Sequence, residues 1–418
     1  MDVVRERLAL AGFGNAAKAL GSRNYRNYVI GNGVSLCGTW MQRVATGWLA
    51  WELTHSGVWL GVLAAADLVA TLLLGPFAGA LADRLERLRV ARVIQLIGAA
   101  RGLLLAALVA FGLVGIWLLL AFTLVQGLIN AFDGSTRLAL VPSLGGRASL
   151  SSALAINSIV FNLARFIGPI GAGFAIAHVG IAFVFAFNGA GYLWFFAALM
   201  TIRLTSVDPL AGERGLLRSV AEGVGYAARH PGLGPMLLLL LVSAVGLRGA
   251  LELLPGFADA VFGRGVEGLA WLMAAVGLGA MIGGLWMVER GSRSGLAALV
   301  STQLLFSILA VAAFAATKLF WVGIPALFVA GFGMVVTGVG GQTLLQISTD
   351  PAMRGRVMSL YGTVFRGGPA LGALLLGLAS SPFGLRWPVV AAAALTFLYW
   401  LWARRGIASV AQALESGR

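Results

Sequence analysis

The sequence predicts an all-α membrane protein in which twelve transmembrane helices form two pseudo-symmetric six-helix bundles. The chain of 418 residues is 59% hydrophobic and 11% charged, and its apolar residues gather into long segments with basic residues between them. A soluble domain averages about 45–50% apolar and about 25% charged residues. Because a water-soluble fold could not hide this much apolar surface, lipid is the solvent that the composition predicts.

Each predicted span is long enough for the hydrocarbon core, which takes about 20 helical residues to cross. The spans are 28–53, 57–81, 90–112, 116–138, 152–177, 180–203, 232–256, 266–288, 296–316, 320–346, 357–379 and 386–403. The predicted organisation is an N-terminal segment 1–27, an N-terminal bundle 28–203, a linker 204–231, a C-terminal bundle 232–403 and a tail 404–418.

A repeated dipeptide supports the division into two related halves. Gly168-Pro169 in the fifth span recurs as Gly368-Pro369 in the eleventh, six spans later. An arginine precedes the proline of each dipeptide, Arg165 by four residues and Arg366 by three, and both spacings place it on the proline's face of the helix. Two parallel halves of this kind are typical of transporters built by duplication.

The distribution of basic residues predicts the orientation of the chain. Of the 30 Lys and Arg residues, 22 lie in the termini and in the loops on one side of the spans, and Arg264, Lys318 and Arg386 lie in the loops on the other. Cytoplasmic loops carry the excess of Lys and Arg. We therefore expect both termini in the cytoplasm and the protein in the inner (cytoplasmic) membrane of the cell.

Two spans carry a stripe of polar residues at positions i, i+3, i+7, i+10 and i+14, which is one face of a helix. The stripes are Asn32, Ser35, Thr39, Gln42 and Thr46 in the first span, and Thr123, Gln126, Asn130, Asp133 and Arg137 in the fourth. Polar side chains that face lipid are costly, so each stripe faces a cavity or another helix. We favour a cavity; helix–helix hydrogen bonding without a substrate role is the alternative.

Charged residues inside spans are the strongest candidates for function, because placing each at a helix centre in the membrane costs at least about 2.5–3.5 kcal/mol of free energy. They are Arg43, Arg101, Arg165, Arg248 and Arg366, with Asp67, Asp133 and Glu252. Asp67 lies about ten residues, or about 15 Å, into its span. It is the first choice for a proton carrier, and an ion pair of Asp67 with Arg43 or Arg101 is the alternative. A spacing of four residues also predicts the pairs Asp133–Arg137 and Arg248–Glu252.

The loop after the second span carries a glycine, an Asp-Arg pair and further basic residues. This pattern, from Gly79 through Asp83 and Arg84 to Arg87, resembles the signature between spans 2 and 3 of the major facilitator superfamily, except that Glu86 stands where the family usually has a second glycine. In that family the motif latches a cytoplasmic gate. The gating residues that the resemblance implies here are Gly79, Asp83, Arg84, Arg87, Arg137, Gly168, Pro169, Gly368 and Pro369.

Four further segments resemble the bacterial branch of this superfamily that holds the enterobactin exporter and drug:proton antiporters: Gly38–Arg43, Ala131–Asp133, Asn157–Pro169 and Arg354–Ser359. The resemblance implies a major facilitator fold that exports small hydrophobic or amphipathic molecules, of drug or siderophore type, by alternating access and proton antiport. Spans 1, 4, 7 and 10 line the cavity in that fold. The expected cavity residues are Asn32, Ser35, Thr39, Gln42, Arg43, Thr46, Gln126, Asn130, Arg165, Arg248, Gln342 and Arg366.

Other functions are less compatible with the sequence. An uptake symporter, a facilitator or a lipid flippase stays open, because residues do not reveal direction or coupling. An enzyme is not expected, since His55, His178, His230 and the single Cys37 form no convergent cluster along the chain. A channel would need a filter-like segment. We expect a monomer whose partners are a small molecule, protons and the bilayer, with no cofactor, no metal and no nucleic acid.

Overall fold

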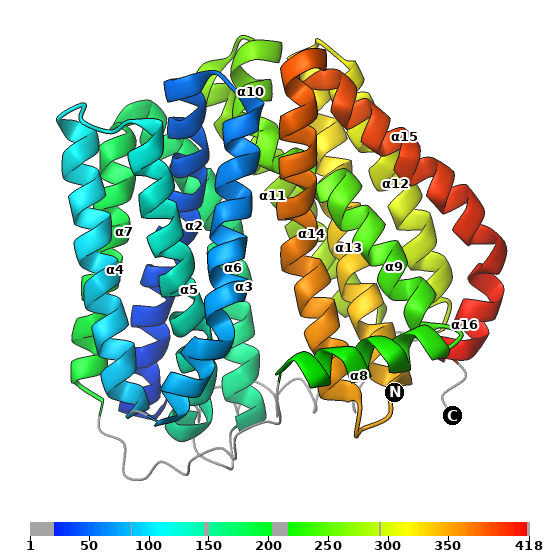
Figure 1. Cartoon of the computed structure of the whole chain (residues 1–418), viewed down its shortest axis with the longest axis horizontal. Coiled ribbons are helices and arrows are strands. Elements are labelled where there is room, and N and C mark those ends of the chain that lie inside the picture. The colour runs from blue at the N-terminus through cyan, green and yellow to red at the C-terminus, as the bar shows by residue number, and fades with distance from the viewer. Residues whose placement is uncertain (1–20, 85, 146–149, 203–215, 292–293, 416–418) are drawn as a thin grey trace. The chain divides into compact units, whose positions relative to one another are not determined.

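The computed structural model consists of helices and short connections over the residues that it describes, which are 21–84, 86–145, 150–202, 216–291 and 294–415 (Figure 1). The all-α prediction is confirmed over these residues. Nine helices in this described part are long and apolar enough to cross a membrane, which agrees with a multi-pass membrane protein. The count of twelve spans stays a prediction.

Every predicted span coincides with helical structure. The helices are α2 (Arg23–Thr54), α3 (Gly57–Arg84), α4 (Arg87–Ala110), α5 (Ile116–Gly145), α6 (Leu150–His178), α7 (Ile181–Met200), α8 (Leu216–Arg229), α9 (Leu233–Ser243), α10 (Leu254–Gly256), α11 (Gly265–Arg290), α12 (Leu296–Ala316), α13 (Phe320–Ser348), α14 (Arg354–Phe383), α15 (Arg386–Ala403) and α16 (Ile407–Glu415).

The chain folds as two compact units. Unit 1 comprises Met1–Thr46 and Val69–Gly212, and unit 2 comprises Gly47–Leu68 and Glu213–Arg418. The end of α2 and the first part of α3 therefore group with unit 2, although they precede the second half of the chain. The boundaries of the two predicted bundles stay a prediction.

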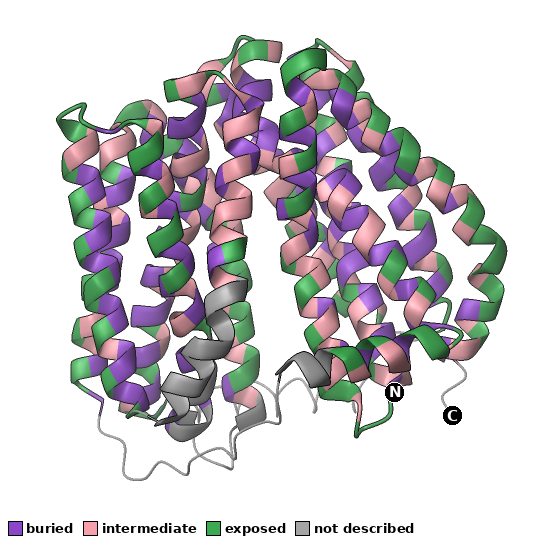
Figure 2. Cartoon of the chain, in the orientation of Figure 1, coloured by how far each residue is buried: buried purple, intermediate pink, exposed green. Residues whose placement is uncertain are grey.

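Large apolar side chains remain exposed on the helices, as expected of a protein whose solvent is lipid. Trp117, Phe174, Leu285 and Val288 are each at least 63% exposed, and exposed residues recur along the helices (Figure 2). On a water-soluble monomer such a surface would favour aggregation. In a bilayer the acyl chains cover it, so the helices must associate through close packing instead.

Glycines provide that close packing in unit 1. A Cβ on Gly102 of α4 would lie 2.9 Å from the backbone of Gly189 in α7, and one on Gly38 of α2 would lie 2.9 Å from the Cα of Asn188. Small residues of this kind let helix backbones approach one another in a membrane. The contacts bring α2, α4 and α7 together around the polar residues of the site.

The seventh predicted span is not a regular α-helix. After α9 the chain forms a π-helix, η2 (Ala244–Arg248), then a 3-10 helix, η3 (Gly249–Leu253), then α10 and a second π-helix, η4 (Phe257–Val261). Pro255 lies within this stretch and removes one backbone donor, and such π turns are frequent at functional sites. Hydropathy predicted a span over 232–256, whereas helical structure continues to Val261, and hydropathy carried no signal of these changes in hydrogen bonding.

The predicted C-terminal tail is helical over its described residues, in η5 (Arg404–Gly406) and α16, and packs against other helices of unit 2. The two carboxylate oxygens of Glu415 accept hydrogen bonds of 2.8 Å from the backbone N–H groups of Gly295 and Ala297, at the start of α12. Ser348 donates to the carbonyl of Leu414 at 2.6 Å. A carboxylate at a helix N-terminus satisfies unpaired donors and complements the helix dipole.

Helix α8 adds two polar contacts to unit 2. The Tyr226 hydroxyl donates to Asp350 at 2.9 Å, and Arg356 pairs with Glu222 at 2.9 Å. Burial raises the pKa of the Tyr226 phenol above its ordinary value, so the hydroxyl, which is already neutral at neutral pH, stays a donor to more alkaline pH.

One pair of variants on α14 tests the close packing in unit 2. A Cβ on Gly372 would collide with the backbone carbonyl of Val245, whereas a Cβ on Gly362 would meet nothing within 4 Å. We expect Gly372→Ala to destabilise the protein by about 1–3 kcal/mol through overpacking. Gly362→Ala should leave stability unchanged or slightly higher, since alanine favours helix. Thermal unfolding in detergent measures both, and equal melting temperatures would contradict the packing described.

Candidate functional site

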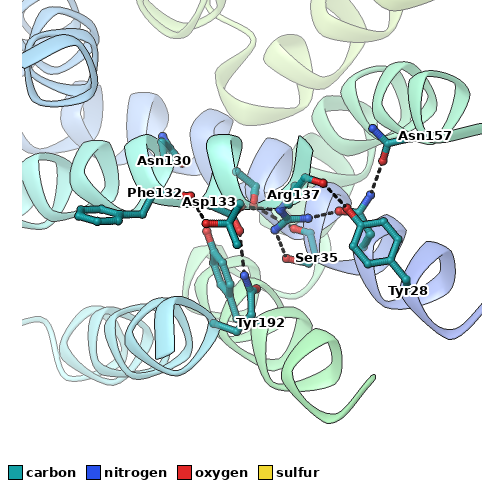
Figure 3. Close-up of polar contacts among 12 residues, drawn as sticks. Tyr28, Ser35, Asn130, Phe132, Asp133, Arg137, Asn157 and Tyr192 are labelled. Atoms are coloured by element: carbon teal, nitrogen blue, oxygen red, sulfur yellow. Dashed lines mark hydrogen bonds and ion pairs between the residues drawn. The ribbon is translucent and has the colours of Figure 1, made fainter. Parts of the chain in front are cut away.

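Arg137 of α5 lies at the centre of a polar cluster inside unit 1 (Figure 3). Its Nε donates to Oδ2 of Asp133 at 2.6 Å, and the two side chains are 11% and 14% exposed. The remaining guanidinium nitrogens donate to Asn32 Oδ1 and, at 3.1 Å, to Ser35 Oγ of α2. The local pair predicted from the spacing of Asp133 and Arg137 is therefore present, and two residues of the α2 stripe belong to it.

Three further helices contribute to this cluster. Gln95 of α4 donates to Oδ1 of Asp133 at 2.8 Å, and Asn32 donates to Asn157 of α6 at 3.3 Å. The Arg137 guanidinium lies 4.6 Å from the ring centroid of Phe195 in α7. The buried charge of Arg137 is thus met by a carboxylate, two polar side chains and an aromatic face. The cluster joins α2, α4, α5, α6 and α7.

A second group of polar side chains lies in the same unit. Arg101 of α4 donates to Gln42 Oε1 of α2 and, at 3.3 Å, to Asn188 Oδ1 of α7. Gln126 of α5 donates to Asn130 at 2.8 Å and to the Tyr192 hydroxyl at 3.2 Å. Sequence reasoning did not select Gln95, Asn188 or Tyr192. Their only signal is a polar group inside an apolar span, and their partners are distant along the chain.

Three side-chain amides of these two polar groups have atoms that can form further hydrogen bonds. Within the described residues, the buried atoms Gln95 Oε1, Gln126 Oε1 and Asn188 Nδ2 make no hydrogen bond. A buried polar atom without a partner costs about 1–3 kcal/mol. These amides are therefore suited to bind a further polar group, such as a water molecule or part of a cargo.

Polar residues of the α2 stripe form hydrogen bonds with other helices inside unit 1, as in the alternative to a cavity-facing stripe. Asn32, Ser35 and Gln42 are each at most 5% exposed and bond to arginines of other helices. Thr39 donates to the carbonyl of Ser35 at 2.9 Å, and Thr46 is half-buried. A role of these residues in cargo binding stays a prediction.

The Gly-Pro repeat has the same packing role in both units. A Cβ on Gly168 of α6 would lie 2.5 Å from the Cβ of Trp40 in α2, and a Cβ on Gly368 of α14 would lie 2.5 Å from the Cβ of Ala244 in η2. The glycine thus lets the fifth span approach the first, and the eleventh approach the seventh. Pro169 and Pro369 follow inside helices α6 and α14.

Trp40 lies between two of the predicted cavity arginines. The Arg43 guanidinium is 5.8 Å and the Arg165 guanidinium 5.6 Å from its ring centroid. Arg43 is exposed and Arg165 half-buried, so this part of unit 1 combines an aromatic surface with positive charge. The stacking gives both arginines a cation–π partner.

The remaining charged candidates lie in unit 2. Arg248 lies 4.0 Å over the ring of Phe365 and lines a small pocket of about 20 Å³ with Thr337, whose buried hydroxyl makes no hydrogen bond in the described structure. Asp67 and Glu252 are half-buried. The backbone changes from a π-helix to a 3-10 helix between Arg248 and Glu252, so their spacing is not that of a regular α-helix, and the predicted pair stays a prediction.

Two other predicted cavity residues belong to the same unit. Gln342 is half-buried in α13, and Arg366 is exposed on α14. Exposure of Arg366 leaves it available to lipid headgroups, solvent or cargo, so its predicted role stays a prediction.

Most of the predicted cytoplasmic latch cannot be placed. Gly79, Asp83 and Arg84 belong to α3, but their side chains lie outside the described residues. Arg87 begins α4 and is 8% exposed. The latch function therefore stays a prediction.

Comparison with known proteins establishes the family. The model of the transmembrane secretion effectors, MFS_3, matches residues 17–412. The chain belongs to this family of the major facilitator superfamily. It is 31% identical to the enterobactin exporter EntS of Shigella boydii serotype 4 (strain Sb227), over 78% of this chain and 77% of that protein. It is 30% identical to EntS of Escherichia coli O139:H28 (strain E24377A / ETEC), with the same coverage.

Solved structures agree on the fold of the family. A bacterial homologue of the human lysosomal transporter Spinster, in an inward-facing and unoccupied conformation, matches with a TM-score of 0.73 and 17% identity, over 94% of this chain and 98% of that one. The nucleoside transporter NupG matches with a TM-score of 0.71 and 14% identity, over 91% of this chain and 98% of that one. The chain therefore has the major facilitator fold. The family to which it belongs is one of transporters and not of enzymes.

A double-mutant cycle tests the Arg137 cluster. Asp133→Asn and Arg137→Gln each leave one buried group without its charged partner, so each should cost about 3–5 kcal/mol. The double variant should lose less than the sum, with a coupling of at least about 1 kcal/mol. Thermal unfolding in detergent gives all four values. Thr123→Val serves as a control, because Thr123 donates only within its own helix, at 2.8 Å to Leu119. Additive losses would contradict the pairing.

Proposed function

We propose that this transporter is a proton-driven exporter of small amphipathic molecules that works by alternating access. It lies in the inner membrane with both termini in the cytoplasm. The observation that carries the proposal is a buried, charged polar cluster inside apolar helices, in a chain related to enterobactin exporters over 78% of its length. Charged groups at membrane depth are costly and mark substrate or ion pathways.

The proposed proton carrier is Asp67. Asp133 is held by Arg137 and Gln95, which suits it to a structural pair. Asp67 is half-buried in an apolar stretch of α3, and Glu252 is the second choice. Neutralising a carboxylate changes its interactions with nearby positive groups, and this difference can shift the balance between inward-open and outward-open states.

The proposed cargo is flat and anionic or polyphenolic. The predicted spans contain five arginines and three carboxylates, which favours a negative partner. Trp40, stacked with Arg43 and Arg165, offers an aromatic and cationic surface of the kind that suits such a molecule. Catecholate siderophores are the first class to test, because the named relatives export enterobactin.

The decisive assay uses purified transporter in vesicles with an imposed pH gradient and a cargo panel that includes catecholate siderophores. For the wild type we expect cargo to move in the direction opposite to the flow of protons down the imposed gradient. Asp67→Asn should lower this rate at least about tenfold, to the level without a gradient, while cargo binding persists. Glu267→Gln, at an exposed position in the first turn of α11, is the matched control and should stay active.

Two outcomes would contradict the proposal. Undiminished gradient-driven transport by Asp67→Asn would remove Asp67 as the carrier. Wild-type transport that ignores the pH gradient, or runs with the protons, would replace antiport by facilitated diffusion or symport.

A further inference from the structure

The end of α2 contacts η4 within unit 2 through Asp259. The indole Nε1 of Trp51 donates to Oδ2 of Asp259 at 2.9 Å, and Nδ1 of His55 lies 3.8 Å from the same oxygen. The His55 ring meets the Trp51 ring edge to face, with centroids 5.6 Å apart. One carboxylate therefore holds two side chains of the segment Gly47–Leu68.

His55 adopts a backbone conformation that ordinarily favours glycine. Its φ is +46°, and no other non-glycine residue in the described part of the chain has a positive φ. Its N–H ends α2 with a 2.7 Å bond to the carbonyl of Trp51, a place where glycine is common. Histidine adopts this region more often than most non-glycine residues, so the turn after α2 accommodates the imidazole.

Close packing makes the fit of the segment sensitive to small changes. A Cβ on Gly256 would lie 2.8 Å from the Trp51 ring, and one on Gly61 would lie 2.8 Å from the Cα of Leu374 in α14. Ser380 of α14 is 8% exposed and would collide with a Cβ on Gly57. We therefore expect a displacement of Gly57 away from α14 to increase the exposure of Ser380.

Trp51 and His55 border open space. Trp51 and His55 line a pocket of about 530 Å³ together with Ser380, Arg386 and Trp387, and Ala260 of η4 next to Asp259 lines it too. The His55 and Asp259 side chains are 69% and 38% exposed, so protons from solvent reach both. The topology predicted from the basic residues places this pocket on the outer face of the membrane.

We propose that His55 and Asp259 form a second proton-binding site, on the outer face, that fastens the segment Gly47–Leu68 to unit 2 when His55 is protonated. Histidine is the side chain whose charge ordinarily changes between about pH 5 and 8. Protonation converts a neutral contact with the Asp259 carboxylate into an ion pair, so acid tightens the segment and alkali loosens it.

The other charges near His55 do not reverse this sign. Glu52, exposed in the last turn of α2 and three residues before His55, carries a charge of the same sign as Asp259. Arg386 lines the pocket, but its guanidinium donates to the carbonyls of Ala315 and Ala316 at the end of α12. Asp259 is thus the anion in direct contact with His55.

The site adds a second proton-binding position to the proposed antiporter, and its role in transport rests on that proposed function. In a proton antiporter, a proton that arrives from outside should favour closure of the outer side. A fastening that tightens on protonation acts in this direction, and it is separate from Asp67.

The test measures how accessible Ser380 is, and it needs no transport. In a Cys37→Ser background, Ser380→Cys is modified with a charged maleimide in lipid nanodiscs at about pH 5.5 and about pH 7.5. Lys318→Cys, in the exposed loop before α13, provides the reference rate that corrects for thiol ionisation. We expect the corrected rate at Ser380→Cys to be about two- to fivefold higher at the alkaline pH, because an exposed ion pair is weak.

The variants decide the assignment. His55→Gln and Asp259→Asn should each abolish this pH dependence, whereas His178→Gln, an exposed histidine at the end of α6, should preserve it. A pH dependence that survives His55→Gln, or a wild-type rate that does not change with pH, would overturn the site. Ser381→Cys, exposed in the same pocket, gives a second reporter if the first variant does not fold. If modification of Ser380→Cys depends on pH as expected but transport is not coupled to protons, the proposed function is refuted and the site at His55 and Asp259 is not.

Discussion

A charged group among apolar helices must find its partners within the protein, because lipid offers none. Arg137 meets this constraint through Asp133, Asn32 and Ser35, which come from its own helix and from α2. The ion pair would be costly to bury alone, and the additional hydrogen bonds offset its desolvation. The relative positions of five helices in unit 1 follow from this requirement, and glycines make their close approach possible.

The two units solve the packing problem in the same way but carry polarity differently. Gly168 and Gly368 bring equivalent helices together, as expected of a duplicated fold. Unit 1 holds connected buried polar groups, whereas unit 2 carries Arg248 on a helix interrupted by π turns. This asymmetry suits a transporter in which one unit supplies most polar recognition and the other a backbone that can rearrange.

Sequence patterns were informative where the physics is local. Hydropathy predicted the spans because a helix must match the bilayer, and a spacing of four residues predicted the Asp133–Arg137 pair. Contacts between distant residues had no such signal, so Gln95, Asn188 and Tyr192 were missed, as was Trp51 with Asp259. The stripe on α2 showed a polar face but could not say whether helices or cargo would cover it. The π and 3-10 turns of the seventh span were not predicted, because hydropathy does not encode hydrogen-bond register.

The central claim is that Asp133 is a carboxylate paired with Arg137 inside unit 1. Infrared difference spectroscopy between the wild type and Asp133→Asn, in nanodiscs with isotope-labelled aspartate at neutral pH, observes this group directly. We expect the substitution to remove a carboxylate band and to leave the protonated-carboxyl region unchanged. Loss of a protonated-carboxyl band instead would mean that Asp133 is neutral, and the network built around Arg137 would have to be abandoned.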